Sequence, residues 1–329
     1  DLDHAKQVMH SQEHQDLALQ VAREGIVLLK NQGNVLPLKK QLKSIAVIGP
    51  DADDAWSQLG DYSPSAVPYK MTTILDGIKQ KLGPQAKVLY AHGCDVMGGK
   101  KDFVEAVAAA RKAEVAVVVV GERPDNAGDK RNGSTDGEGY DVASLDLTGN
   151  QEELVQAIQA TGTPVVLVLV NGRPLSVRWE AEHIPAIVEA WEPGERGGEA
   201  VADVLFGDYN PAGRLTQTWV ASMDQLPPMM DYDIRHGRTY MYLRQKPLYA
   251  FGYGLSYTSF AYSHLALSSD TLRAGARLTV TFELHDTGAH DGDEVAQLYV
   301  AHIGSRVPRP IEELKGFERV HLDAGEVQN

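Results

Sequence analysis

The chain has 329 residues, enough for about two domains, and its 43% hydrophobic and 23% charged content excludes a disordered or fibrous protein. Its formal net charge of −14 repels phosphate backbones and other polyanions, so we expect no nucleic-acid partner, while neutral ligands such as sugars remain open. The single cysteine, Cys94, excludes an intrachain disulfide, and no apolar run reaches the roughly 18–20 residues of a membrane-spanning helix, so no membrane partner is expected.

Residues 1–30 predict one amphipathic helix, because Leu17, Val21 and Leu28 recur on a single helical face. Gly33 and Asn34 are typical of the turn that ends a helix. The first residue is Asp1, and no signal-peptide pattern follows it. We therefore expect the sequence to begin inside a longer protein.

From residue 44 onward, short apolar runs alternate with amphipathic segments. The runs predict strands at 44–48, 87–90, 115–120, 164–170 and 186–190. The amphipathic segments predict helices at 72–81, 101–112, 147–161 and 198–206. Strands that are apolar on both faces and alternate with helices indicate an α/β fold, with a mainly parallel sheet covered on both sides.

The pattern changes after residue 210. Residues 211–254 contain Pro227 and Pro228 and show little periodicity, which is typical of a long linker. Segments with a period of two residues follow at 265–267, 278–284 and 295–300, which predict an antiparallel β-sandwich. Three to five strands can be recognised, fewer than the roughly seven of an immunoglobulin-like sandwich, so we expect this sandwich to be incomplete.

These patterns divide the chain into four parts. Residues 1–43 lead into the fold, 44–215 form the α/β sandwich domain, 216–254 form a linker, and 255–329 form the incomplete β-sandwich.

Ligands of open parallel sheets bind at the loops that follow the strands, and three loops qualify. The first, residues 49–63, has only Gly49 where a dinucleotide site needs Gly-X-Gly-X-X-Gly, and its Pro50 and three aspartates would repel a pyrophosphate. Nucleotide binding is therefore not expected, and an ordinary acidic surface loop is the alternative.

In the third loop, residues 171–175, Arg173 is expected to brace neighbouring carboxylates.

The second loop, residues 121–146, is longer than the roughly 12–15 residues usual for a structureless segment, which favours a functional role. It is rich in carboxylates, namely Glu122, Asp125, Asp129, Asp136, Glu138, Asp141 and Asp146. Solvated surface groups would explain most of them, but one that is placed in a partly dry site could act as a general acid.

Other chemistry has little support. The eleven histidines form no His-Glu-X-X-His motif, and no Gly-X-Ser-X-Gly nucleophile elbow occurs. Gly252–Tyr257 is better explained as a turn with packed aromatic residues. We expect no metal and no cofactor.

Nine stretches, in order along nearly the whole chain, resemble the C-terminal half of family 3 glycoside hydrolases, the β-glucosidase and β-xylosidase group. They are 22–31 (AREGIVLLKN), 36–38 (LPL), 45–50 (IAVIGP), 136–141 (DGEGYD), 149–151 (GNQ), 171–175 (NGRPL), 191–194 (WEPG), 206–215 (FGDYNPAGRL) and 251–258 (FGYGLSYT). The resemblance implies a three-layer α/β sandwich and a fibronectin-type-III-like β-sandwich, both following a (β/α)-barrel that this chain lacks.

It also implies an exo-acting retaining β-glycosidase in which an aspartate of the barrel is the nucleophile. The position that matches the acid/base glutamate is Glu138, and Glu122 is the second choice. Tyr62 lies where some relatives place an aromatic platform for the leaving-group sugar, although a packed tyrosine is the competing interpretation. Where members often carry arginine, this chain has Val142.

The expected partners are a β-linked oligosaccharide or aryl glycoside and the N-terminal barrel, and a homo-oligomer remains open. A β-glucosidase is favoured over a β-xylosidase, and a non-catalytic carbohydrate-binding or structural chain is the alternative from another class. Polysaccharide breakdown would suit a secreted or periplasmic protein. Without the barrel, we expect little or no activity.

Overall fold

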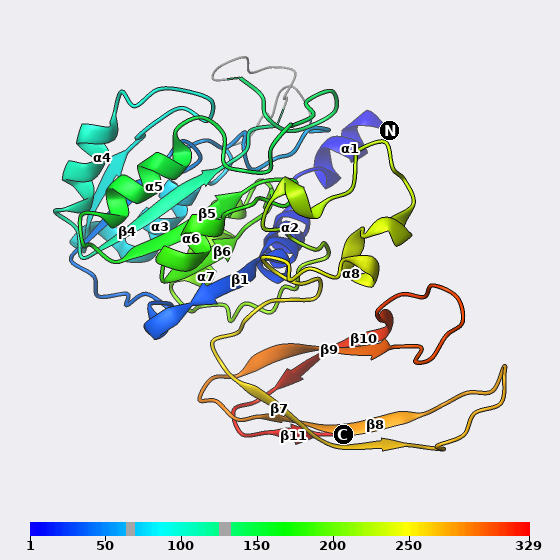
Figure 1. The fold of residues 1–329 in the computed structure, drawn as a ribbon. Helices are drawn as coiled ribbons and strands as arrows, with labels where there is room; N and C mark the ends of the chain where they lie inside the picture. Colours follow the sequence, from blue (N-terminus) through cyan, green and yellow to red (C-terminus); the bar gives the residue numbers. More distant parts are fainter. Residues whose placement is uncertain (64–69, 125–132) are drawn as a thin grey trace.

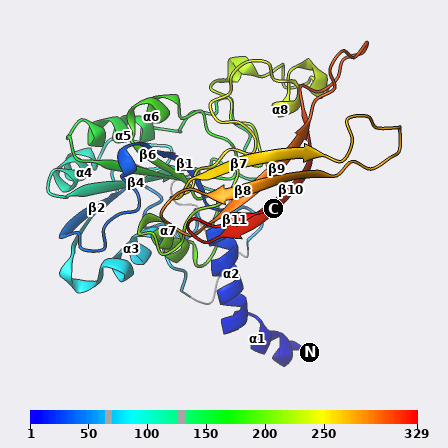
Figure 2. The same cartoon turned by 90° about the horizontal axis from the view of Figure 1, so that it is seen from below.

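The structure is a computed structural model that describes residues 1–63, 70–124 and 133–329. Figure 1 shows an α/β part, in which helices cover a central sheet, and a smaller group of antiparallel strands beside it. The view from below in Figure 2 shows α1 and α2 extending away from the sheet toward the N-terminus.

The central sheet has six strands in the order β1-β6-β5-β4-β2-β3. They are β1 (Val27–Asn31), β2 (Ser44–Ile48), β3 (Lys87–Ala91), β4 (Val115–Gly121), β5 (Val165–Val170) and β6 (Ala186–Glu189). Strands β2 to β6 run parallel, and β1 pairs antiparallel with β6 at the edge. The predicted parallel sheet is confirmed.

Helices cover both faces of this sheet, because its strands are apolar on both sides. Helices α2 (Gln12–Gly25), α3 (Ile74–Leu82) and α7 (Gly197–Leu205) pack on one face. Helices α4 (Phe103–Ala110) and α5 (Gln151–Gln159) pack on the other, next to the short α6 (Arg178–His183). Alternate residues of β4 enter the two cores, so that Val117 faces one and Val118 the other. The fold is a three-layer α/β sandwich, as predicted.

The prediction of one helix over residues 1–30 is wrong. The segment forms α1 (Leu2–Val8), α2 and then strand β1. The backbone turns at His10, where φ is +57°, and the Ser11 side chain caps α2 by accepting a hydrogen bond from the His14 N–H. The apolar residues from Val27 onward pair with β6, because burial at the sheet edge outweighs their helical periodicity.

Helix α5 also starts later than predicted, at Gln151 rather than at residue 147. The Thr148 hydroxyl donates to the carbonyl oxygen of Val96 at 2.8 Å, outside the helix. The Gln151 side chain accepts from the Gly121 N–H at 2.8 Å and donates to the Gly121 carbonyl at 2.8 Å. These bonds tie the start of α5 to the end of β4. Helix α6 was not among the predicted elements.

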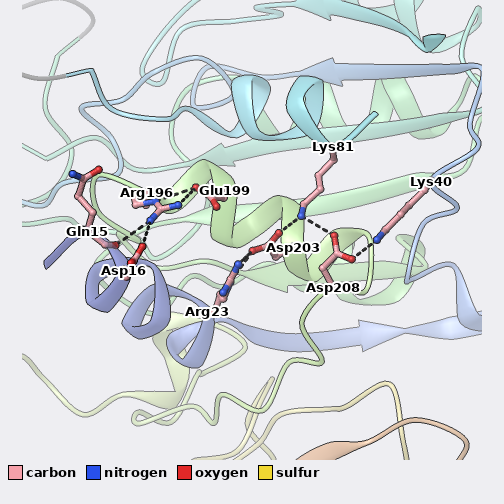
Figure 3. A network of polar contacts seen from close by, with 9 residues as sticks. All are labelled: Gln15, Asp16, Arg23, Lys40, Lys81, Arg196, Glu199, Asp203 and Asp208. Carbon is pink, nitrogen blue, oxygen red and sulfur yellow. Dashed lines mark hydrogen bonds and ion pairs between the residues drawn. The ribbon is translucent and has the colours of Figure 1, made fainter. Parts of the chain in front are cut away.

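Buried Asp203 of α7 joins three elements (Figure 3). Its carboxylate accepts from the Nε of Arg23 on α2 at 2.6 Å and pairs with Lys81 of α3. Lys81 also pairs with Asp208 at 2.6 Å, and Asp208 pairs with Lys40. At the other end of α7, Arg196 binds Asp16 at 3.0 Å and Glu199 at 2.5 Å. Charged groups therefore hold α2, α3 and α7 together on one face of the sheet.

The segment after the α/β part is mostly irregular. It contains the 3₁₀ turns η3 (Met223–Gln225) and η4 (Ile234–His236) and the short helix α8 (Thr239–Tyr242). Near its end, the Leu255 N–H donates to the Leu28 carbonyl of β1 at 2.9 Å, and the Tyr253 hydroxyl donates to the Leu29 carbonyl at 3.1 Å. The segment that leads to the last strands is thus bonded to the first strand of the central sheet.

The last strands form two antiparallel sheets, β10-β9 and β11-β8-β7. Their bounds are β7 (Phe260–Leu267), β8 (Val280–Asp286), β9 (Gly292–Val300), β10 (Glu313–Leu322) and β11 (Val327–Gln328). Arg214 pairs with Glu294 of β9 at 2.6 Å, which links these strands to the end of the α/β part. Over the three described ranges, no helix is long and apolar enough to span a membrane.

Candidate active site

Four loops follow the parallel strands β2, β4, β5 and β6, and contacts among their side chains bring them together at the carboxyl ends of these strands. The loop after β4 carries Glu138, and the loop after β2 carries Asp61 and Tyr62. The loop after β5 carries Arg173, and the loop after β6 carries Glu192. In parallel sheets this edge is where ligands usually bind.

Glu138 is exposed and makes two contacts with the loop after β2. The Tyr62 hydroxyl donates to Oε2 of Glu138 at 2.8 Å, and the Glu138 N–H donates to Oδ2 of Asp61 at 2.6 Å. The Tyr62 side chain is 86% exposed, so the competing interpretation of a packed tyrosine is wrong. The hydrogen bond to Glu138 raises the pKa of the Tyr62 phenol, which keeps the hydroxyl a proton donor.

Arg173 holds the loop after β4 in place. Its Nε donates to Glu122 at 3.0 Å, and its Nη2 donates to Asp136 at 2.9 Å and to the Thr135 carbonyl at 2.6 Å. The second carboxylate oxygen of Asp136 accepts from the Gly172 N–H at 3.0 Å. The predicted bracing role of Arg173 is confirmed by these contacts.

Glu122, the second choice for the acid/base, lies in a different environment. It is 3% exposed, and burial raises its pKa to about 7, with Asp136 adding to the rise and Arg173 opposing it. Its carboxylate is already bound to Arg173, which leaves it less accessible to a substrate than Glu138.

Glu192 joins the same cluster and was not singled out from the sequence. Burial, with repulsion from Asp136 and Asp61, raises its pKa to about 7. Its side chain approaches the backbone of Gly60 so closely that a Cβ on Gly60 would lie 2.5 Å from Oε2. The signal was available, because Trp191 and Glu192 directly follow a predicted strand in the same way as the other three loops.

Among the other carboxylates of the long loop, the structure describes Asp141 and Asp146. Asp125 and Asp129 lie outside the described residues. Asp141 is exposed, and Asp146 accepts from the Ser144 hydroxyl at 2.7 Å. In the loop after β2, Asp54 pairs with Arg123 at 2.9 Å.

Two further acidic groups are fully buried next to this edge. Burial raises the pKa of Asp51 and of Glu189 well above the usual range. Among residues 1–63, 70–124 and 133–329, no group of three or more His, Cys, Asp or Glu side chains is arranged to hold a metal ion.

The turn at Gly252–Tyr257 is a packing element, as predicted. The Tyr257 hydroxyl donates to the Val204 carbonyl of α7 at 2.8 Å, and the Ser256 hydroxyl donates to Asn210 at 2.8 Å. Its serine hydroxyl is thus engaged with the α/β part.

Residues 26–257 match the model of the glycosyl hydrolase family 3 C-terminal domain, and residues 294–329 match a fibronectin type III-like domain. The chain belongs to glycosyl hydrolase family 3. This membership accounts for the α/β sandwich and for the antiparallel strands that follow it.

Two family 3 relatives carry different substrate names. The chain is 42% identical to a β-xylosidase of Formosa agariphila, with 96% of this chain and 44% of the relative aligned. It is 38% identical to a periplasmic β-glucosidase of Salmonella typhimurium, with 95% of this chain and 44% of the relative aligned. The chain therefore spans less than half the length of these curated relatives.

Solved structures agree with the fold. A β-glucosidase of Erythrobacter marinus superposes with a TM-score of 0.84 at 38% identity, covering 98% of this chain and 46% of that one. A β-glucosidase of Listeria innocua in complex with isofagomine gives a TM-score of 0.82 at 30% identity, covering 97% of this chain and 44% of that one.

Proposed function

We propose that this chain supplies the general acid/base half of an exo-acting retaining β-glycosidase that releases terminal, non-reducing β-D-glucose. In this proposal Glu138 is the acid/base and Tyr62 contacts the substrate. The observation that carries it is the pairing of an exposed carboxyl group, Glu138, with an exposed aromatic ring, Tyr62, at the carboxyl edge of the parallel sheet. A glycosidase needs a carboxyl group to protonate the leaving oxygen and a surface that holds the departing sugar.

A retaining glycosidase uses two displacements, with two carboxyl groups about 5–5.5 Å apart. In the first, the nucleophilic carboxylate attacks the anomeric carbon, Glu138 gives its proton to the glycosidic oxygen, and the bond to the leaving group breaks. In the second, Glu138 takes a proton from water as the water oxygen attacks the anomeric carbon and displaces the nucleophile. Both carboxyl groups return to their starting states.

The nucleophile in this proposal belongs to the N-terminal barrel domain that precedes this region in the family. One carboxylate cannot perform both displacements, so the chain by itself is expected to have little or no activity. The partner of this chain is then the barrel of the same enzyme, whose closure over Glu138 would remove water from the acid.

Tyr62 would serve the leaving-group side. Its exposed ring can stack on the apolar face of a pyranose, which removes apolar surface from water. Its hydroxyl donates to Glu138, and a glycosidic oxygen would take the place of this hydroxyl next to the acid.

Glucosides are proposed as substrates because several similar solved structures are named β-glucosidases, including one of Listeria innocua in complex with glucose. The second candidate is a β-xylosidase, which the relative from Formosa agariphila favours. The two sugars differ by the hydroxymethyl group of glucose.

The test uses the full-length natural protein that contains this sequence, first identified by intact mass. Aryl β-glucosides and β-xylosides are assayed with wild type and Glu138→Ala, with and without azide. We expect Glu138→Ala to lose about 10²–10⁴-fold in kcat and azide to restore turnover on a good leaving group. Glu105→Gln, an exposed change on α4, is the matched control and should behave as wild type.

Each outcome has a distinct meaning. The preferred aryl glycoside decides between the glucosidase and the xylosidase. Full activity in Glu138→Ala would overturn the acid/base assignment, and Glu122 would be tested next. Sugar binding without turnover by the full-length protein would instead support the non-catalytic carbohydrate-binding alternative.

A further inference from the structure

We propose that Asp61 is the positioning residue that holds the acid/base loop at Glu138, by accepting a hydrogen bond from the Glu138 backbone. This inference rests on the proposed role of Glu138. It concerns a residue of the loop after β2 that acts on the loop after β4, so that the two loops form one unit.

The contact is short and involves a charged acceptor. Oδ2 of Asp61 lies 2.6 Å from the Glu138 backbone nitrogen, and an ionised acceptor makes such a hydrogen bond stronger than one between neutral groups. This bond restrains the backbone of Glu138 and does not involve its carboxyl group. The Tyr62 hydroxyl, on the residue next to Asp61, meets the Glu138 side chain itself at 2.8 Å. Adjacent residues of one loop therefore hold both the backbone and the carboxyl group of Glu138.

The backbone just before Glu138 is shaped for this contact. Gly137 has φ +107°, a conformation that residues with a Cβ rarely adopt. A Cβ on Gly137 would lie 2.8 Å from Cγ of Asp61. The close approach of the Asp61 carboxylate therefore requires glycine at position 137.

The residue before Asp61, Gly60, also has a conformation that only glycine adopts easily. Gly60 has φ +75°, and a Cβ there would lie 2.5 Å from Oε2 of Glu192. Behind Gly137, the side chain of Asp136 is fixed by Arg173 at 2.9 Å and by the Gly172 N–H at 3.0 Å. The hydrogen bond from the Glu138 N–H to Asp61 thus joins two turns that are each fixed by the neighbouring loops.

Two substitutions of Asp61 test its positioning role, because asparagine retains a side-chain carbonyl oxygen that can accept the hydrogen bond and alanine has none. Asp61→Ala removes the acceptor for the Glu138 N–H, whereas Asp61→Asn keeps one and removes only the charge. Gly137→Ala should displace the same contact from the other side. Asp323→Ala, an exposed carboxylate in the turn between β10 and β11, is the matched control.

The main readout is the dependence of kcat/KM on the leaving group in the full-length natural protein, because kcat/KM reports the first displacement and not the second, in which Glu138 acts as a base. A misplaced acid slows substrates whose leaving group needs protonation and spares 2,4-dinitrophenyl glycosides, whereas general damage slows all of them alike. We expect Asp61→Ala and Gly137→Ala to lose about 10- to 100-fold in kcat/KM on poor leaving groups, and Asp61→Asn to stay within about threefold of wild type.

A second readout needs no activity. In the full-length natural protein, amide hydrogen exchange at Glu138 should accelerate in Asp61→Ala and remain close to wild type in Asp61→Asn.

Glu138→Ala, measured beside these variants, separates the two proposals. If it shows no leaving-group dependence, the proposed function fails. If it shows that dependence while Asp61→Ala matches wild type or slows every substrate equally, the positioning role of Asp61 alone is overturned. Unchanged exchange at Glu138 in Asp61→Ala would overturn it as well.

Discussion

The side chains of Tyr62 and Glu138 meet at 2.8 Å, although 76 positions separate them in the sequence. They come from the loops after β2 and β4, two neighbouring strands of the parallel sheet. An exposed hydrogen bond of this kind contributes only about 0.5–1.5 kcal/mol net, so a ligand that makes its own hydrogen bonds there can replace it. The ring and the hydroxyl of Tyr62 therefore have separable tasks.

Substitutions at Tyr62 should separate these tasks. We expect Tyr62→Phe, which keeps the ring, to retain KM within about threefold, whereas Tyr62→Ala should raise KM about tenfold or more for a disaccharide, because the stacking surface is lost. An aryl or disaccharide assay of the full-length natural protein measures both. Equal KM values for the two variants would contradict a stacking role.

The pKa of the Tyr62 phenol should also depend on the charge of Glu138. Its pKa is raised first by the hydrogen bond to Glu138 and then by the charge of that carboxylate. Glu138→Gln removes the charge, so the pKa of Tyr62 should fall toward the ordinary value of about 10. Titration of ¹³C-labelled tyrosine by NMR would follow it, with Tyr62→Phe identifying the signal. An unchanged pKa in Glu138→Gln would mean that the two side chains do not meet in solution.

The ion pairs of Asp203 should matter for stability. Its side chain is 1% exposed between Arg23 and Lys81. We expect Asp203→Asn to lower the free energy of unfolding by about 3–5 kcal/mol, because Arg23 loses its ion pair and Lys81 keeps only Asp208 as a partner. Urea denaturation measures the loss. Asp16→Asn, which breaks an ion pair whose Asp16 side chain is 62% exposed, should cost less than about 1 kcal/mol.

Glu180 should give stability a specific pH dependence. It is 1% exposed, and burial raises its pKa to about 7. Between its unfolded pKa of about 4.3 and pH 7 the folded state holds more protons than the unfolded state, so the contribution of Glu180 to stability falls as pH rises through this window. Glu180→Gln, which mimics the neutral form, should match wild type near pH 4.

At pH 8 the same variant should be more stable than wild type by about 3 kcal/mol, because the wild-type carboxyl must then ionise inside the core. Denaturation at several pH values tests this difference. Glu182→Gln, an exposed neighbour on α6, should show no such dependence. A constant offset between Glu180→Gln and wild type across the pH range would argue against a raised pKa.

The core of the fold could be predicted because its strands are buried on both faces. The apolar run from Val115 to Val120 has the length of a strand, and a strand that is apolar on both faces belongs in the middle of a parallel sheet. Strand β1 could not be predicted in the same way. Val27, Leu28 and Leu29 suit the end of a helix equally well, and only their pairing with β6 decides between the two.

The same limit applies to the candidate site. The position of Arg173 after a strand was enough to predict that it braces carboxylates, because parallel strands end at one edge. The approach of Asp61 to the Glu138 backbone depends on the turns at Gly60 and Gly137, and loop conformation does not follow from residue periodicity. The roles of Glu138 and Tyr62 stay predictions until the variants are measured.

The hydrogen bond from the Leu255 N–H to the Leu28 carbonyl joins two residues that are far apart in the sequence. Leu28 lies in the first strand of the α/β sheet, and Leu255 follows the last strand, β6. The chain enters the sheet at β1, which is an edge strand, so the two ends of the α/β part meet at one edge of the sheet. A unit with adjacent ends can be cut out and transplanted into a host loop without stretching either connection. A piece that begins with α2, whose Leu19 and Ala22 belong to the core, and ends at Leu255 would carry the acid/base loop together with the loops that hold it.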